Sequence, residues 1–214
     1  MKSDYTEGNA FQWSFFAPHD MDNFIAAIGG KKELETRLDT LFTTSSQIDG
    51  AEASGDITGL IGQYAHGNEP SHHMAYLYNW TDSPWKGQEY LDYIMQNFYT
   101  NEPDGIIGNE DCGQMSAWYL FSVMGFYPVC PGTDEYVLGA PYLPYLKLKL
   151  PNGNTLEIKA PGVSDKKRYV QSLKLNGKVY DKMYITHEDI LKGGVLEFKM
   201  SASPNKRRGL TKED

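Results

Sequence analysis

The spacing of apolar residues changes near residue 130, and this change constrains the fold more than any other feature of the sequence. Before it, apolar residues recur every three or four positions, as in 21–28, 31–42 and 85–99. That spacing places them on one face of a helix. After it, apolar and polar residues alternate, as in 145–150, which favours strands with one buried and one solvated face. The sequence therefore predicts an α+β fold, in which paired helices precede a small antiparallel β portion.

Capping and breaking residues delimit the expected helices. Asp20 or Asp22 can cap a helix over 21–28, and Gly29-Gly30 can end it. Pro70-Ser71 is expected to open a further helix over 71–80. The stretch from Gly113 to Phe126 is apolar all round, so we expect an inner helix there that Pro128 ends.

The expected strands come in hairpins separated by turn sequences. Segments 145–150 and 155–160 flank Pro151-Asn-Gly-Asn154, while 170–175 and 178–180 flank Asn176-Gly177. A further strand is expected over 195–200. We therefore divide the chain into a helical part, 1–132, and a β-strand part with a polar tail, 133–214.

Composition limits the classes of function. The chain has 214 residues and a formal net charge of −8, so a nucleic-acid or anionic-membrane partner is not expected. It has no apolar run of about 18 residues, and its start lacks the charged-then-apolar layout of a signal peptide. Cys112 and Cys130 are too few for a disulfide framework and lack metal-ligand spacing.

The candidate chemistry lies in three loop segments rich in carboxylates, amides and aromatic residues. Zinc-protease, nucleophile-elbow, phosphate-loop and dinucleotide motifs are missing from the sequence, although the histidines of the second segment are possible metal ligands. What is left suits acid/base work on glycosidic bonds and an oxygen-ligand cation site. The segments are YTEGNAFQWSFFAPHD with Glu7, QYAHGNEPSHH with His66, Asn68, Glu69, His72 and His73, and GNEDCGQ with Asn109, Glu110 and Asp111.

Each segment also has a purely structural interpretation. Glu7 beside a glycine can be a solvated loop acid. Asn68-Glu69-Pro70 can be a helix entry with Ser71 as the cap, and Glu110 with Asp111 can simply favour a helix dipole. The segments taken singly leave both interpretations open.

Taken together, the three segments resemble the C-terminal part of glycoside hydrolase family 92. The resemblance rests on YTEGNAFQWSFFAPHD, YAHGNEPSHHMAYLYNW and DGIIGNEDCGQMSAWYLFSVMGFYPVCPG, and it covers essentially the whole chain. It implies a calcium-dependent, exo-acting α-mannosidase that inverts the anomeric centre. The family joins an N-terminal β-sandwich to an (α/α)6 toroid, so this chain is expected to hold the later barrel helices and closing strands.

The resemblance also implies roles for individual residues. Glu7 is expected to be the general acid, kept protonated by the aromatic residues around it, and Asp111 the general base, held ionised by the N-terminus of the following helix. Asn109 stands where family members often carry another acid, so Glu110 is a possible stand-in. Calcium is expected on Asn68 and Glu69, and sugar contacts on Gln12, Trp13, His66 and Asn109.

The same resemblance sets expectations for partners and activity. The substrate would be a mannose-containing glycan with terminal, most simply α-1,2, linkages, and the location periplasmic or secreted. The N-terminal β-sandwich and the earlier barrel helices of a parent chain would complete the pocket, so the isolated chain is expected to be inactive. The alternative is a non-catalytic carbohydrate-binding or structural helical fragment.

Overall fold

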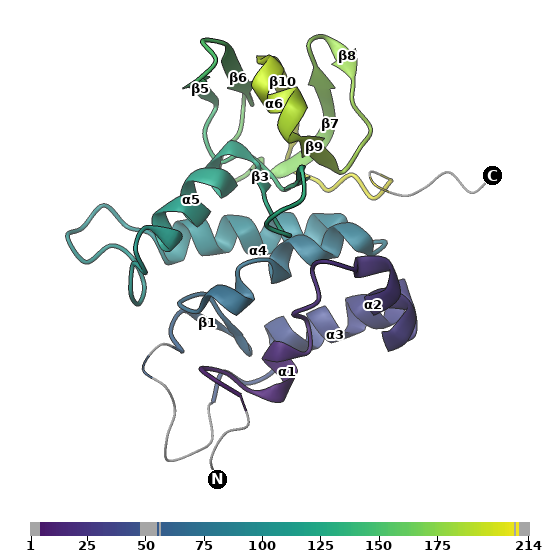
Figure 1. The fold of residues 1–214 in the computed structure, drawn as a ribbon, viewed down its shortest axis with the longest axis vertical. Helices are drawn as coiled ribbons and strands as arrows, with labels where there is room; N and C mark the ends of the chain where they lie inside the picture. Colours follow the sequence, from purple (N-terminus) through teal and green to yellow (C-terminus); the bar gives the residue numbers. More distant parts are fainter. Residues whose placement is uncertain (1–4, 48–54, 56, 208, 210–214) are drawn as a thin grey trace.

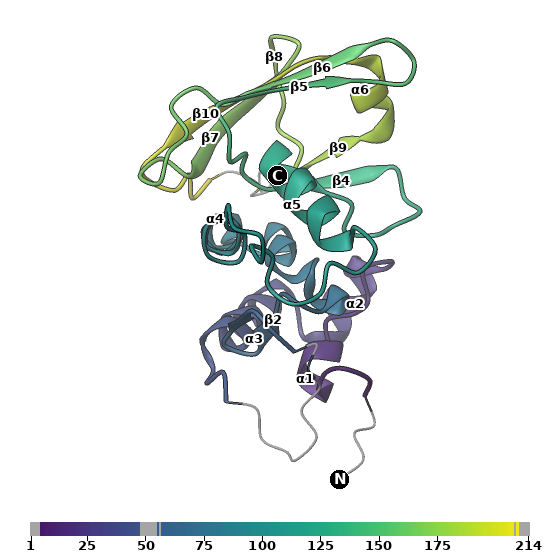
Figure 2. The same ribbon diagram turned by 90° about the vertical axis from the view of Figure 1, so that its left-hand side faces the viewer.

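The computed structural model describes residues 5–47, 55, 57–207 and 209. The helical elements gather at one end of the molecule and most of the strands at the other, with α4 (Pro84–Asn97) and α5 (Gln114–Met124) between them (Figures 1 and 2). The predicted α+β class is thus confirmed. Within the described ranges, none of the helices has the length and apolarity that crossing a membrane requires.

The first helices form where the capping residues predict them. Asp20 accepts a hydrogen bond from the backbone N–H of Asn23, and Gly29 ends the helix with a φ of 106°, a left-handed conformation that favours glycine. The next helix buries one apolar face formed by Leu34, Leu38, Leu41 and Phe42. The elements before α4 are α1 (Ala10–Trp13), α2 (Met21–Ile28), α3 (Lys31–Thr43), β1 (Leu60–Ile61), β2 (Tyr64–Ala65), η1 (Glu69–Ser71) and η2 (Met74–Trp80).

The segment 71–80 is not the α-helix that its pattern suggests. It forms the 3₁₀ helices η1 and η2, with bonds such as Tyr76 N–H to His73 O at 3.0 Å. Residues 74–78 are all buried, so this part of η2 has no solvated face. Gly87 lets α4 approach η2 closely, since a Cβ at Gly87 would lie 2.5 Å from the Ala75 carbonyl oxygen.

Helix α5 differs from the expected inner helix in two ways. It ends at Gly125, whose φ of 90° breaks it three residues before Pro128. It also buries only one face, containing Met115, Trp118, Ser122 and Val123, while Leu120 on the other face is 59% exposed. Apolar residues on an uncovered helix face indicate a surface that another element can cover.

The β portion contains a five-stranded and a three-stranded sheet. The five-stranded sheet has the order β5-β6-β10-β7-β8, and Asn176-Gly177 forms the predicted tight turn with φ values of 52° and 78°. Pairing is antiparallel as expected, except that β10 runs parallel to β6. The strands are β3 (Phe126–Tyr127), β4 (Glu135–Leu138), β5 (Tyr145–Lys149), β6 (Thr155–Lys159), β7 (Tyr169–Leu175), β8 (Lys178–Val179), β9 (Tyr184–Thr186) and β10 (Gly194–Ser201), with α6 (His187–Lys192) before β10.

Several short elements were not anticipated, namely α1, α6 and the strands β1 to β4 and β9. Each of these strands has two to four residues, too few to show an alternating pattern. Strand β3 pairs with β4 across residue 132, so the division of the chain there stays a prediction. In the polar tail, residues 208 and 210–214 lie outside the described residues.

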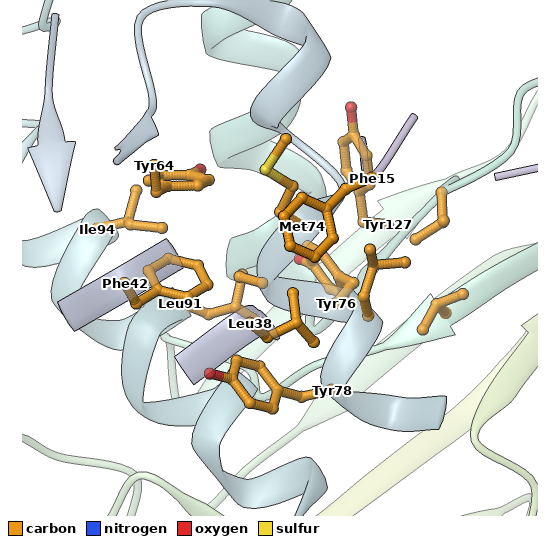
Figure 3. Close-up of a cluster of buried hydrophobic side chains, with 14 of the residues drawn as sticks. Phe15, Leu38, Phe42, Tyr64, Met74, Tyr76, Tyr78, Leu91, Ile94 and Tyr127 are labelled. Atoms are coloured by element: carbon orange, nitrogen blue, oxygen red, sulfur yellow. The ribbon is translucent and has the colours of Figure 1, made fainter. Parts of the chain in front are cut away.

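A large aromatic core supports the loop end of the helical portion. It joins side chains from α3, η2, α4 and α5 with Phe15 and Tyr64 (Figure 3). Strand β7 is fastened to α4 beside it. The Val170 N–H donates to Gln88 Oε1 at 3.0 Å, and the Arg168 guanidinium lies 2.7 Å from Asp92. The helical and β portions are therefore held together by specific polar contacts.

Candidate active site

The three loop segments singled out in the sequence meet around residues 65–69. Asn68 donates from its side-chain amide to the Glu7 backbone oxygen at 2.5 Å, which ties the first segment to the second. The third segment approaches through Gly108, where a Cβ would lie 2.5 Å from Thr58 Oγ1. Thr58 O in turn accepts from Gly67 N–H at 3.1 Å. The contacts that join the loops thus do not use their acidic side chains.

The charges of Glu7 and Asp111 both act on the Glu69 carboxyl, and we call these three acids the carboxylate cluster. The pKa of the Glu69 carboxyl is raised, chiefly by partial burial, although its own backbone N–H opposes this. The charge of Asp111, a hydrogen bond with the Asp111 carboxyl and the charge of Glu7 all raise it further. Mutual repulsion of this kind disfavours having every member ionised. Each of the three segments therefore contributes one acid whose charge influences the protonation of Glu69 or is carried by Glu69 itself.

The two predicted catalytic acids have unusual backbone conformations. Glu7 and Asp111 have φ values of 52° and 51°, and Cys112 follows at 56°. Apart from glycine, the only other described residue with positive φ is Asn176 in the hairpin turn. A left-handed conformation costs about 1–2 kcal/mol in residues with a Cβ, and such strain gathers at functional sites. Both acids that the resemblance implies as general acid and base thus lie on left-handed backbone.

The start of α5 stabilises Glu110 rather than Asp111. Glu110 Oε1 accepts from the Ser116 backbone N–H at 3.1 Å, whereas Asp111 accepts from Gln114 N–H only through its backbone oxygen. The expected hydrogen bond between the helix N-terminus and the Asp111 carboxylate is therefore not formed among the described residues, and that carboxyl is hydrogen-bonded to Glu69 instead. Asn109 is exposed before this pair.

His66 is completely buried behind the carboxylates. Its Nδ1 lies 2.7 Å from the Tyr64 hydroxyl and its Nε2 lies 2.7 Å from the Tyr99 hydroxyl. Burial keeps the pKa of the imidazole well below its usual range, and the neighbouring His72 lowers it further. With both nitrogens engaged and no exposed surface, the ring supports the site in this chain and has no group directed at a sugar.

His72, Gln114 and Tyr127 form a polar layer next to the cluster. His72 Nε2 lies 2.9 Å from the His66 carbonyl oxygen, and His72 Nδ1 lies 3.1 Å from Gln114 Nε2. Burial lowers the pKa of His72 to about 4, so the ring is neutral and Nδ1 accepts. The sequence offers no signal for this layer beyond the position of Gln114 in the GNEDCGQ stretch.

Gln12 and Trp13 shape the loop that carries Glu7. Gln12 is buried and forms a capping box with Asn9, and its Nε2 donates to the Gln63 carbonyl oxygen at 2.7 Å. Trp13 Nε1 donates to the Thr6 carbonyl oxygen at 3.0 Å, and the indole is partly exposed. Glu7 itself is exposed. The water exclusion expected around it from nearby aromatic residues is therefore not provided by the described part of the chain.

The structure bears out the helix entry at Asn68-Glu69-Pro70, with Glu69 in the first turn of η1, but not the expected cap at Ser71. Asn68 precedes η1 without any side-chain capping bond, and Ser71 lies inside η1 instead of before it. His73 Nε2 is engaged with the Phe15 carbonyl oxygen at 3.0 Å. Among the residues that the structure describes, no three His, Cys, Asp or Glu side chains are grouped to hold a metal ion. The Asn68 side chain, although Asn68 is the N-cap residue of η1, makes no capping bond and is bonded to Glu7 instead.

The three segments thus bring Glu7, Glu69 and Asp111 near one another, with Glu7 and Asp111 on left-handed backbone. The model of the glycosyl hydrolase family 92 catalytic domain matches residues 1–202. The chain therefore belongs to this family of glycosidases. Its C-terminal resemblance to the family, stated from the three motifs, is confirmed.

Solved structures and a curated relative agree with this assignment. A family GH92 α-mannosidase from Bacteroides thetaiotaomicron, in complex with mannoimidazole, is 45% identical with a TM-score of 0.91 over 97% of this chain. A GH92 inverting mannosidase from the same species is 35% identical with a TM-score of 0.83 over 97% of this chain. An uncharacterized secreted glycosidase from Arthroderma benhamiae is 28% identical over 91% of this chain.

The matched proteins are much longer than this chain. It spans 27% and 29% of the two Bacteroides chains and 23% of the Arthroderma protein. The described residues therefore represent about a quarter of such a protein.

Proposed function

We propose that this chain carries the acid/base half of the active site of a calcium-dependent, inverting exo-α-mannosidase. Glu7 is the general acid and Asp111 the general base, acting on terminal α-linked mannose, α-1,2 in the first instance. The observation that carries the proposal is the Glu7–Glu69–Asp111 cluster, with its two outer members held on left-handed backbone. The identity of the sugar is inferred from the mannosidase relatives, since the cluster itself does not distinguish one hexose from another.

Inversion requires two carboxyl groups with different protonation on opposite sides of the sugar. Glu7 donates a proton to the leaving oxygen, while Asp111 takes one from the water that attacks the anomeric carbon. Glu69 is hydrogen-bonded to Asp111, and its own pKa is raised, so Glu69 is a member of the cluster that favours holding a proton. Glu110 is the weaker candidate for the base, because its carboxylate is engaged with the Ser116 N–H.

The residues present fit part of a calcium site. Asn68 uses its amide nitrogen on Glu7, and its Oδ1 accepts no hydrogen bond from the described residues. This oxygen and the Glu69 carboxylate are hard donors of the kind that Ca²⁺ prefers. Backbone carbonyls, water and sugar hydroxyls would supply the other ligands. When bound, the ion would neutralise the cluster and hold sugar hydroxyls.

The other parts of the proposal follow from the length of the relatives. The earlier barrel helices and an N-terminal β-sandwich of a parent chain would complete the (α/α)6 toroid, cover Leu120 and exclude water from Glu7. Trp13 and Asn109 would contact the sugar, with Gln12 and His66 supporting them. We expect the isolated chain to be inactive. A periplasmic or secreted location is supported by the secreted relative.

The test uses the longer parent protein with α-1,2-mannobiose, first with calcium and then with a chelator. Proton NMR follows which anomer of the released mannose appears first. The proposal expects β-mannose first and no release with chelator. Release of α-mannose first would make Asp111 a nucleophile and overturn inversion. Absence of release from any α-mannoside would instead favour a carbohydrate-binding or structural role.

A further inference from the structure

The amide of Gln114, the first residue of α5, is held in one orientation by two neighbours. Its Nε2 lies 3.1 Å from His72 Nδ1 and 3.4 Å from the Tyr127 hydroxyl. His72 fixes which end of the amide faces it. Because the other ring nitrogen is bonded to the His66 carbonyl oxygen at 2.9 Å, that nitrogen carries the hydrogen and Nδ1 is an acceptor. Only the NH₂ end of Gln114 can satisfy such an acceptor.

The opposite end of the same amide is left without a partner. Gln114 Oε1 accepts no hydrogen bond within the described residues, and the only buried side-chain polar atom lacking a partner there is Thr58 Oγ1. Oε1 is therefore accessible to a ligand. An amide with its nitrogen satisfied and its oxygen open presents an acceptor of fixed direction, which suits a sugar hydroxyl.

The position of this amide relates it to the carboxylates. Gln114 lies three residues after Asp111, and its N–H donates to the Asp111 carbonyl oxygen at 3.1 Å. The residues that hold its side chain also lie near the cluster, since the charge of Asp111 reaches His72 and that of Glu69 reaches Tyr127. In Figure 3 the Tyr127 hydroxyl points away from the apolar side chains of the core. The open oxygen thus belongs to a residue that is bonded to the backbone of Asp111, and the groups that hold its amide feel the charges of the acids.

We propose that Gln114 is a sugar-binding residue, whose Oε1 accepts a hydrogen bond from one hydroxyl of the terminal sugar, and that His72 is the positioning residue that orients it. The proposal rests on the mannosidase function proposed above. It predicts that the enzyme is specific for one hydroxyl group of the sugar. When a substrate lacks that hydroxyl, Gln114 Oε1 is buried by the substrate without a hydrogen-bond donor, which costs binding energy.

The test compares the parent enzyme and its Gln114→Met variant on α-mannosides deoxygenated at the 2, 3, 4 or 6 position. Methionine keeps the length of the side chain and removes its polar end. For one deoxy substrate we expect kcat/KM of the parent enzyme to fall about tenfold. The Gln114→Met variant should show the same fall in kcat/KM on the unmodified mannoside. Its kcat/KM should not fall further when that mannoside is replaced by the deoxy sugar. A general packing defect would lower activity on all substrates equally.

Gln171→Met is the matched control. Gln171 lies in β7, outside the three loop segments, and its amide donates one hydrogen bond to the Ser203 carbonyl oxygen. It should retain the deoxy-sugar pattern of the parent enzyme. If Gln114→Met does not fold, Gln114→Asn withdraws the amide by one carbon and is judged in the same way. An active variant that keeps every deoxy-sugar penalty of the parent enzyme overturns the Gln114 proposal alone. A parent enzyme without mannosidase activity overturns the proposed function, and the Gln114 proposal with it.

Discussion

The loops of the helical portion and the sheets of the β portion are stabilised in different ways. In the loops, Glu7, Asp111 and Cys112 have left-handed backbones, and Glu69 is crowded by two like charges. In the sheets, the left-handed residue Asn176 is a turn residue whose Oδ1 accepts from the Val195 N–H at 2.8 Å. In the β portion, left-handed backbone thus occurs at a turn residue that favours it, whereas in the loops it occurs at residue types that disfavour it. The strained region is therefore where we expect chemistry.

The strongest test of this contrast removes the charge of the proposed base. In the parent enzyme, Asp111→Asn should lower kcat about 10³-fold, because general-base catalysis contributes about 10²–10⁴. The thermal midpoint should change little, since Asp111 is exposed. The control is Asp104→Asn, which changes an exposed acid of the loop before the site. Equal activity of the two variants would remove Asp111 from the mechanism.

A second prediction concerns acid stability of the layer behind the carboxylates. Burial lowers the pKa of His66 and His73, and lowers that of His72 to about 4. The unfolded chain therefore binds protons below about pH 6.5 that the folded chain does not bind, so stability is full above that pH and is lost on acidification. His72 alone should lower the free energy of unfolding by about 2 kcal/mol between pH 7 and pH 5.

Urea unfolding at pH 7, 6 and 5 measures this loss. His19→Gln is the control because His19 is exposed, and the variant should reproduce the pH dependence of the unchanged chain. A free energy of unfolding that stays constant down to pH 5 would show that the three rings are protonated in the folded state.

A third prediction tests whether the two portions unfold together. The Tyr169 hydroxyl of β7 donates to Glu89 Oε1 of α4 at 2.5 Å, across the junction. Tyr169→Phe should lower the free energy of unfolding by about 1 kcal/mol, whereas Tyr145→Phe on the exposed edge strand should have no effect. All four tryptophans, Trp13, Trp80, Trp85 and Trp118, lie before β3. Their fluorescence and the far-UV signal should share one transition, and two separate transitions would show independent portions.

Local chemistry explains which parts of this molecule are readable from the sequence. The hairpin at Asn176-Gly177 needs φ values above zero that these residue types supply, so it was predicted correctly. The parallel pairing of β6 with β10 joins distant segments and carries no local signal. Likewise, the motifs pointed to Glu7 and Asp111, yet nothing in their spacing shows that Glu110 takes the helix N–H or that Glu69 lies against Asp111. Those facts depend on backbone angles that residues with a Cβ rarely adopt.

The smallest effect tests whether the carboxylate cluster lowers stability, as repulsion between its members implies. Partial burial and the neighbouring carboxylates raise the pKa of Glu69 above its ordinary value, so the folded state favours the protonated form. Its stabilising contribution is present below pH 4.5 and is lost as the pH rises through the raised pKa. Without calcium at pH 7, Glu69→Gln should therefore raise the thermal midpoint by about 1 °C, since exposure screens the repulsion. This gain should vanish below pH 4.5.

The same thermal midpoints measured with added calcium test the opposite effect, which is stabilisation by a bound ion. A bound ion stabilises the folded state by mass action, so added calcium should raise the midpoint of the unchanged parent protein and leave that of Glu69→Gln where it was. Glu102→Gln, an exposed acid outside the cluster, should respond to calcium as the unchanged protein does. A Glu69→Gln variant that is less stable at pH 7 and still responds to calcium would show that Glu69 supports the fold. The contrast between strained loops and relaxed sheets would then have to rest on the backbone of Glu7 and Asp111 alone.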